Sequence, residues 1–149
     1  MGKGESISCI GPHQVQVDGE AIFVSFSGPY LPDEARQLLT LADGLYRKYG
    51  AVVLVADVSQ LGSMGAETRR VVGTWPFLGI YQTIVYNATK PLRILLDLMS
   101  AARRLLGLKN PVQLQLVATH REAVSWLAEQ RRLRNPLGDS APKSIEKSG

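Results

Sequence analysis

Sulfur is scarce in this chain, which has 149 residues and a single cysteine, Cys9. One cysteine excludes an intramolecular disulfide and is typical of proteins of the reducing cytoplasm, where we expect this protein to work. Cys9 lies between Ser8 and Ile10, and nothing nearby would activate a thiol. We therefore expect it to be buried as a small packing residue.

Long uncharged apolar segments are also missing. The most apolar helix candidate, 92–108, is interrupted by four charged residues, so no segment is predicted to span a membrane. Residues 1–5 have no apolar core and do not predict a signal peptide.

Residues that carry catalytic chemistry are few as well. Of the two histidines, His13 precedes a predicted strand and His120 opens a predicted helix, where we expect it to be exposed. The chain has no Gly-x-Ser-x-Gly elbow, no Cys/His pair at a useful spacing, no metal-ligand cluster and no Gly-x-Gly-x-x-Gly dinucleotide motif. We therefore predict a protein that is not an enzyme and binds no cofactor or metal. A hydrolytic or transfer enzyme that uses Asp57 as a base is the alternative.

The positive charge is concentrated near the carboxyl terminus. The formal net charge is +4, and beyond Gln130 five basic residues against two acids account for +3 of it. The body of the chain is therefore close to neutral. No aromatic platform lies among basic residues, so nucleic acid is not an expected partner.

Turn and periodicity signals predict an α/β fold. Asp18-Gly19 lies between two alternating patterns and predicts a β-hairpin whose second strand ends at Phe26. Pro32 predicts the start of a helix, which Gly50 ends. The elements expected after it are the strand 51–56, a helix from Ala66 to about Gly73, the strand 82–86, a helix from Thr89 to about Gly107, the strand 112–118 and a helix from Thr119. This order predicts a mixed sheet of four to five strands with four helices packed on it.

Polar residues follow the predicted central strand. In parallel sheets, ligands and partners bind where strands end and helices begin. Asp57, Ser59 and Ser63 fall at such a place, in a segment with two glycines that we expect to be a loop. The hydroxyl of Ser63 is a candidate helix cap. The alternative is phosphorylation, which would put a dianion at the helix amino end, with Arg69 and Arg70 one and two turns on.

This arrangement resembles the STAS domain, the fold of anti-sigma-factor antagonists. The resemblance covers 15–133 and rests on the hairpin, on Gly28 after its second strand, and on a strand that ends in Asp-Val-Ser at 57–59. More narrowly, the chain is similar to antagonist-like bacterial proteins of this length. These have an arginine pair in the second helix and a closing Glu-Ala-x-x-Trp-Leu helix, which is 122–127 here.

The resemblance implies a non-enzymatic regulatory module that binds a protein partner, such as a kinase or an anti-sigma-like regulator. Antagonists of this fold present a phosphorylatable serine in an Asp-Ser-Ser-Gly run at the start of the second helix. This chain has Leu-Gly-Ser-Met-Gly at 61–65, without the acid, and Ser63 is the nearest match. The implied partner surface spans 57–70. Its candidate residues are Asp57, Ser59, Ser63, Arg69 and Arg70.

The antagonist-like proteins are also similar in outline to the CRAL-TRIO lipid-binding fold, in which helices part to admit an apolar ligand. This similarity implies an alternative function as carrier or sensor of a small apolar molecule or lipid. The candidate pocket residues are aromatic or aliphatic: Trp75, Phe77, Tyr81, Tyr86, Leu92 and Leu96. The same residues are also typical of an ordinary domain core.

We expect one STAS-like domain over 1–134 and a disordered basic tail over 135–149, which is rich in Pro, Gly, Ser and Lys. An exposed apolar face is common in sheets of this type, which leaves a homodimer open.

Overall fold

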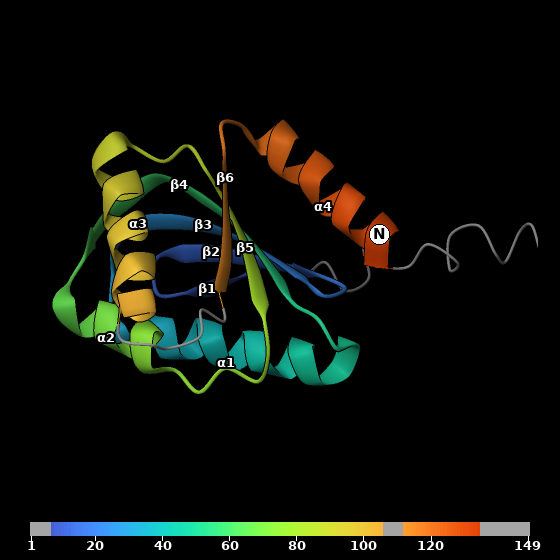
Figure 1. Cartoon of the computed structure of the whole chain (residues 1–149), viewed down its shortest axis with the longest axis horizontal. Coiled ribbons are helices and arrows are strands. Elements are labelled where there is room, and N and C mark those ends of the chain that lie inside the picture. Colours follow the sequence, from blue (N-terminus) through green and yellow to red (C-terminus); the bar gives the residue numbers. More distant parts are fainter. Residues whose placement is uncertain (1–6, 106–111, 135–149) are drawn as a thin grey trace, which may run out of the picture.

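The computed structural model describes residues 7–105 and 112–134. Within these ranges the chain forms one six-stranded mixed sheet with four helices (Figure 1). The elements in chain order are β1 (Ile7–Ile10), β2 (His13–Asp18), β3 (Ala21–Tyr30), α1 (Pro32–Tyr49), β4 (Val53–Met64), α2 (Ala66–Thr74), β5 (Tyr81–Tyr86), α3 (Lys90–Leu105), β6 (Val112–Val117) and α4 (His120–Arg134). The strands lie in the sheet in chain order. The pairs among β1, β2 and β3 are antiparallel, and those from β3 to β6 are parallel.

The predicted mixed α/β fold is therefore confirmed, with six described strands in place of four to five. The extra strand is β1, which pairs with β2 through a turn at Gly11. The hairpin predicted at Asp18-Gly19 is present, and Gly19 adopts the left-handed conformation that its turn requires, with φ 60°. Cys9 is exposed, contrary to expectation, because it lies on the outer strand of the sheet.

Strands β3 and β4 extend beyond their predicted ends. We expected β3 to end at Phe26 and a loop to replace the second half of β4, but the two strands stay paired as far as Tyr30 and Met64. At two bulges, β4 has one more residue than β3 between paired positions, first between Asp57 and Gln60 and then between Leu61 and Met64. A Cβ atom at Gly62 would lie 2.9 Å from the carbonyl carbon of Gly28, so this glycine permits close approach of two strands. The glycine that predicted a loop is in fact a strand residue.

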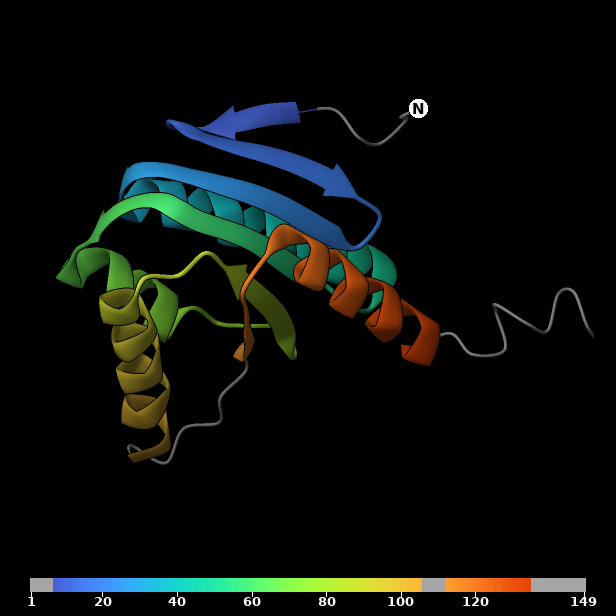
Figure 2. The same ribbon diagram turned by 90° about the horizontal axis from the view of Figure 1, so that it is seen from above.

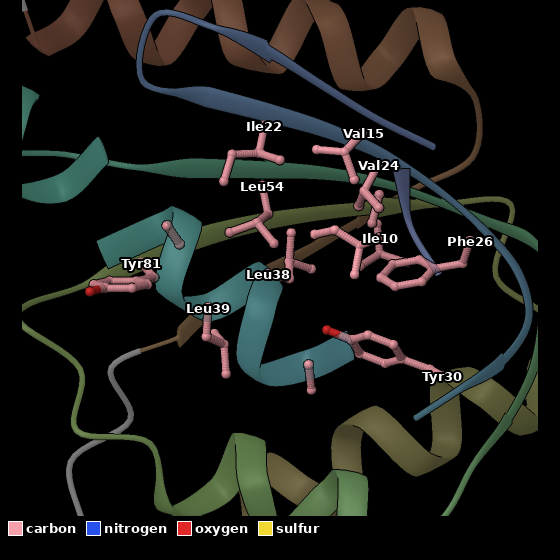
Figure 3. Packing of buried hydrophobic residues seen from close by; sticks show 14 of the residues in the cluster. Ile10, Val15, Ile22, Val24, Phe26, Tyr30, Leu38, Leu39, Leu54 and Tyr81 are labelled. Carbon is pink, nitrogen blue, oxygen red and sulfur yellow. The ribbon is translucent and has the colours of Figure 1, made fainter. Parts of the chain in front are cut away.

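Side chains of β4 alternate between two cores on opposite faces of the sheet. Leu54 and Ala56 point to the larger core, which α1, α2 and α3 cover, whereas Val53 and Val55 point to a smaller core under α4. Viewed from above, α4 lies in front of the sheet and α1 behind it (Figure 2). Figure 3 shows the larger core, in which side chains of β2, β3 and β4 meet α1.

Local signals at the ends of α1 and at the starts of α3 and α4 are confirmed. Gly50 ends α1 in the left-handed conformation, with φ 75°. The hydroxyls of Thr89 and Thr119 accept hydrogen bonds from backbone N–H groups in the first turns of α3 and α4. The predicted helix end near Gly107 and the predicted tail 135–149 lie outside the described residues.

Candidate functional site

Asp57 lies where β4 stops pairing with β5, and it is partly exposed. Its Oδ1 atom accepts hydrogen bonds from the backbone N–H of Ser59 at 3.0 Å and from the side-chain amide of Asn87 at 3.2 Å. Partial burial alone would raise the pKa of Asp57, but these hydrogen bonds and the nearby His120 outweigh it and hold the pKa below its usual value. Asp57 is therefore an ionised carboxylate. Its hydrogen bonds connect the end of its pairing with β5 to Ser59 on β4 and to Asn87, the residue that follows β5.

Both candidate serines are exposed on the second half of β4. This half, residues 58–64, pairs with β3 on one side, whereas the pairing with β5 on the other side ends at Asp57. Ser63 does not cap α2 as we expected, because the helix begins after Gly65, which is the N-cap residue. Ser59 and Ser63 thus lie on a strand with one edge that no described strand pairs.

The two candidate arginines lie on α2, and each has a partner close in sequence. The Nη1 atom of Arg69 donates to the carbonyl oxygen of Met64 at 2.9 Å. Arg70 forms an exposed ion pair with Glu67, with 2.6 Å between Nη2 and Oε2. Within the described part of the chain no hydrogen bond or ion pair joins either arginine to Ser63. A phosphate on Ser63 would have to recruit them from these contacts.

A cavity of about 470 Å³ lies between the sheet and helices α1, α2 and α3. Its lining is apolar apart from a few side chains, and its volume is in the range of small-molecule sites. Four of the six predicted pocket residues line it, namely Phe77, Tyr81, Leu92 and Leu96. The structure therefore brings together residues of the α2–β5 connection, β5 and α3 around one space.

Trp75 and Tyr86, the other two predicted pocket residues, are not part of this lining. The indole N–H of Trp75 lies 3.3 Å from both carboxylate oxygens of Asp43. Tyr86 belongs to the smaller core, and its hydroxyl lies 2.9 Å from Nδ1 of His120. Since strand side chains alternate, a lining position at Tyr81 puts Tyr86, five residues on, at the opposite face of the sheet.

Sequence reasoning missed a buried pair near one end of the cavity. His13 is 1% exposed, and its Nε2 lies 2.8 Å from Oε1 of Glu34. The backbone N–H of Ser27 donates to His13 Nδ1 at 2.9 Å, so Nε2 carries the proton and donates to the carboxylate. The rings of Phe26 and Tyr30, which line the cavity, pack edge-on against the imidazole. The pair ties β2, β3 and α1 together beside the cavity wall.

One residue of the sequence, Gly11, is constrained by this pair. A Cβ atom at Gly11 would overlap the Glu34 carboxylate, and Gly11 also has a φ of 59°. His13 and Glu34 are 21 residues apart, so no local spacing reveals their contact. In the ranges that the structure describes, no group of His, Cys, Asp and Glu side chains could hold a metal ion, and no helix is long and apolar enough to cross a membrane.

No protein-family model and no curated protein matches the sequence. The arrangement of strands and helices is nevertheless that of the anti-sigma-factor antagonists, the STAS fold, which confirms the predicted resemblance. One solved structure to which it is similar is that of the anti-sigma factor antagonist SpoIIAA in its unphosphorylated form. The similarity has a TM-score of 0.54, covers 78% of this chain and 97% of that one, and comes with 15% sequence identity. At that identity the likeness shows a shared fold.

Proposed function

We propose that the protein is a non-enzymatic regulatory module that binds a protein partner through residues 57–70. The observation that carries the proposal is the position of residues 58–64, which extend past β5 and lead directly into α2. A strand edge without a neighbour is a ready site for main-chain pairing with an extended segment of another protein. A solved structure with this fold is named an anti-sigma factor antagonist, which supports a regulatory role.

Ser63 is the residue that we propose as the switch of this surface. It is exposed and lies two residues before the N-cap of α2, within reach of a modifying kinase. A phosphate there would stand near the free N–H groups and positive dipole end of α2. It would also compete with the carbonyl of Met64 for the guanidinium of Arg69, which now donates to that carbonyl. Partner affinity would then change with phosphorylation.

Affinity purification from the source cells tests this function. Tagged wild-type protein is used to isolate its complexes, which are identified and quantified by mass spectrometry. The variants Ser63→Glu and Asp57→Ala should alter the amount of one specific partner several-fold. Ser125→Glu and Asp33→Ala introduce the same changes at exposed positions on α4 and α1 and should leave it unchanged. Equal recovery of every partner with all four variants would contradict the proposal.

A second candidate function is the carrying or sensing of a small apolar molecule, which the cavity favours. At about 24 cal/mol per Å³, a closed empty cavity of 470 Å³ would cost up to about 11 kcal/mol. That is comparable to the whole free energy of unfolding of a typical domain, about 5–15 kcal/mol. Opening the cavity to water lowers this cost but leaves apolar walls exposed to solvent, so an apolar occupant would stabilise the fold.

Native mass spectrometry of the gently purified protein, followed by organic extraction, tests the second function. We expect an added mass that disappears after denaturation and a small apolar compound in the extract. A mass equal to that of the bare chain, together with no rise in melting temperature when apolar compounds are added, would contradict it.

A further inference from the structure

We propose that the cavity binds an apolar molecule with one neutral hydrogen-bond-accepting oxygen, such as a ketone or ester carbonyl, and that the hydroxyl of Tyr30 donates to that oxygen. The proposal rests on the second candidate function above and adds the chemistry of the ligand.

Tyr30 lies in the cavity wall, where its backbone and ring have contacts but its hydroxyl has no hydrogen-bond partner among the described residues. The side chain is 7% exposed and lines the cavity. Its carbonyl oxygen accepts from the hydroxyl of Thr68 at 2.7 Å, and its ring packs edge-on against Phe26, with 4.7 Å between centroids. Within the part of the chain that the structure describes, the phenol oxygen makes no hydrogen bond, and it is not among the fully buried atoms that lack a partner, so it remains accessible to a small molecule. Figure 3 shows this oxygen directed toward Leu38, which also lines the cavity.

The three other hydroxyl side chains of the lining differ from Tyr30. The hydroxyl of Thr74 donates to the carbonyl oxygen of Arg70 at 2.7 Å. The hydroxyl of Tyr81 donates to Asp43 and accepts from the backbone N–H of Leu78 at 3.4 Å, so it is already satisfied. Thr83 makes no hydrogen bond to another described residue either, but its side chain is only partly buried and can be hydrated. The Tyr30 side chain is more deeply buried, and its hydroxyl has no partner among the described residues, so it is the polar group that a ligand in the cavity would satisfy.

The surroundings of Tyr30 define the ligand's polar group. Burial and the nearby carboxylate of Glu34 raise the pKa of the Tyr30 phenol, so it stays protonated and donates. The same carboxylate disfavours an anionic group beside it. The arginines that reach the lining, Arg69 and Arg70, already donate to Met64 and Glu67. An uncharged oxygen acceptor on an apolar body therefore fits the cavity best.

Two isosteric probes test the proposal. 2-Acetylnaphthalene has a carbonyl oxygen where 2-isopropenylnaphthalene has a methylene group, so their shapes match. Dissociation constants of both probes are measured by titration calorimetry with the wild type, Tyr30→Phe and Thr83→Val. The ratio of the two constants within one protein is compared between proteins, which cancels the different hydration of the probes.

We expect the preference for the ketone to fall about five- to tenfold in Tyr30→Phe, the effect of one neutral hydrogen bond, and to persist in Thr83→Val. The infrared carbonyl stretch of 2-acetylnaphthalene bound to the wild type should also lie at lower frequency than in an apolar solvent such as hexane, a comparison that requires no variant to fold. An unchanged preference in folded Tyr30→Phe, or an unshifted stretch, would overturn the role of Tyr30 and leave the second candidate function standing. If neither probe binds the wild type, the role of Tyr30 and the second candidate function are both contradicted.

Discussion

Adding methyl groups to the cavity wall should stabilise the protein. Ala56 is 4% exposed on β4 and lines the cavity, so the two extra carbons of Ala56→Val would enter space that no side chain fills. At about 0.8 kcal/mol for each buried methylene group, the free energy of unfolding should rise by about 1.5 kcal/mol. For a chain of this size, that corresponds to about 3–6 °C in melting temperature.

The matched control is Ala21→Val on β3. Ala21 is also a buried strand residue, 0% exposed, but it faces the smaller core under α4 and does not line the cavity. The same two carbons should overpack that core and lower the free energy of unfolding by about 1–3 kcal/mol. Both variants are compared by thermal and urea unfolding followed by circular dichroism. A destabilisation of Ala56→Val equal to that of Ala21→Val would show that the space beside Ala56 is already filled.

Three further predictions concern the contacts that shape the site. Gly11→Ala should lower the melting temperature by several degrees, because its Cβ would overlap the Glu34 carboxylate at a positive φ. Because the pKa of Asp57 is lowered in the folded state, the ionised carboxylate stabilises the fold at pH values above its ordinary pKa of 3.8. This contribution is lost as the pH falls through the folded-state pKa. Asp57→Asn should therefore reduce the loss of unfolding free energy at acidic pH, measured by urea unfolding across a pH series. Arg131→Met should lower the free energy of unfolding, measured in urea, by about 1–3 kcal/mol. Arg131 connects α4 to Glu20 on the β2–β3 turn, with 2.9 Å between its Nη2 and Oε1 of Glu20.

The elements that local chemistry determines could be predicted from the sequence. The hairpin turn needs a residue with positive φ, and Asp18-Gly19 provides it. Helix α1 begins at a proline and ends at Gly50, and α4 begins after a threonine cap. Each of these signals lies within a few residues of the structure that it determines, so no knowledge of the rest of the chain was needed.

The second half of β4 could not be predicted, because its cause lies elsewhere in the chain. In the sequence, Gly62 is typical of a loop. In the structure it lies on β4, where the absence of a side chain lets the strand pack closely against Gly28 on β3. For the same reason, the sequence left open whether the candidate pocket residues enclose a space or fill a core. The cavity wall joins Tyr30 to Leu96, residues that are far apart in sequence and that alone are typical of a core. The apolar pattern predicted that these residues lie in the interior of the domain. Only the packing of the helices against the sheet shows that a space is left between them.

Hydrogen–deuterium exchange of the isolated complex tests the central claim, that residues 57–70 form the partner surface. The exchange of backbone amides is compared between the free protein and its complex with the partner recovered by wild-type protein. We expect slower exchange in the complex across residues 58–64 and the first turn of α2. Protection confined to β1 or α4, with exchange at 58–70 unchanged, would contradict the account.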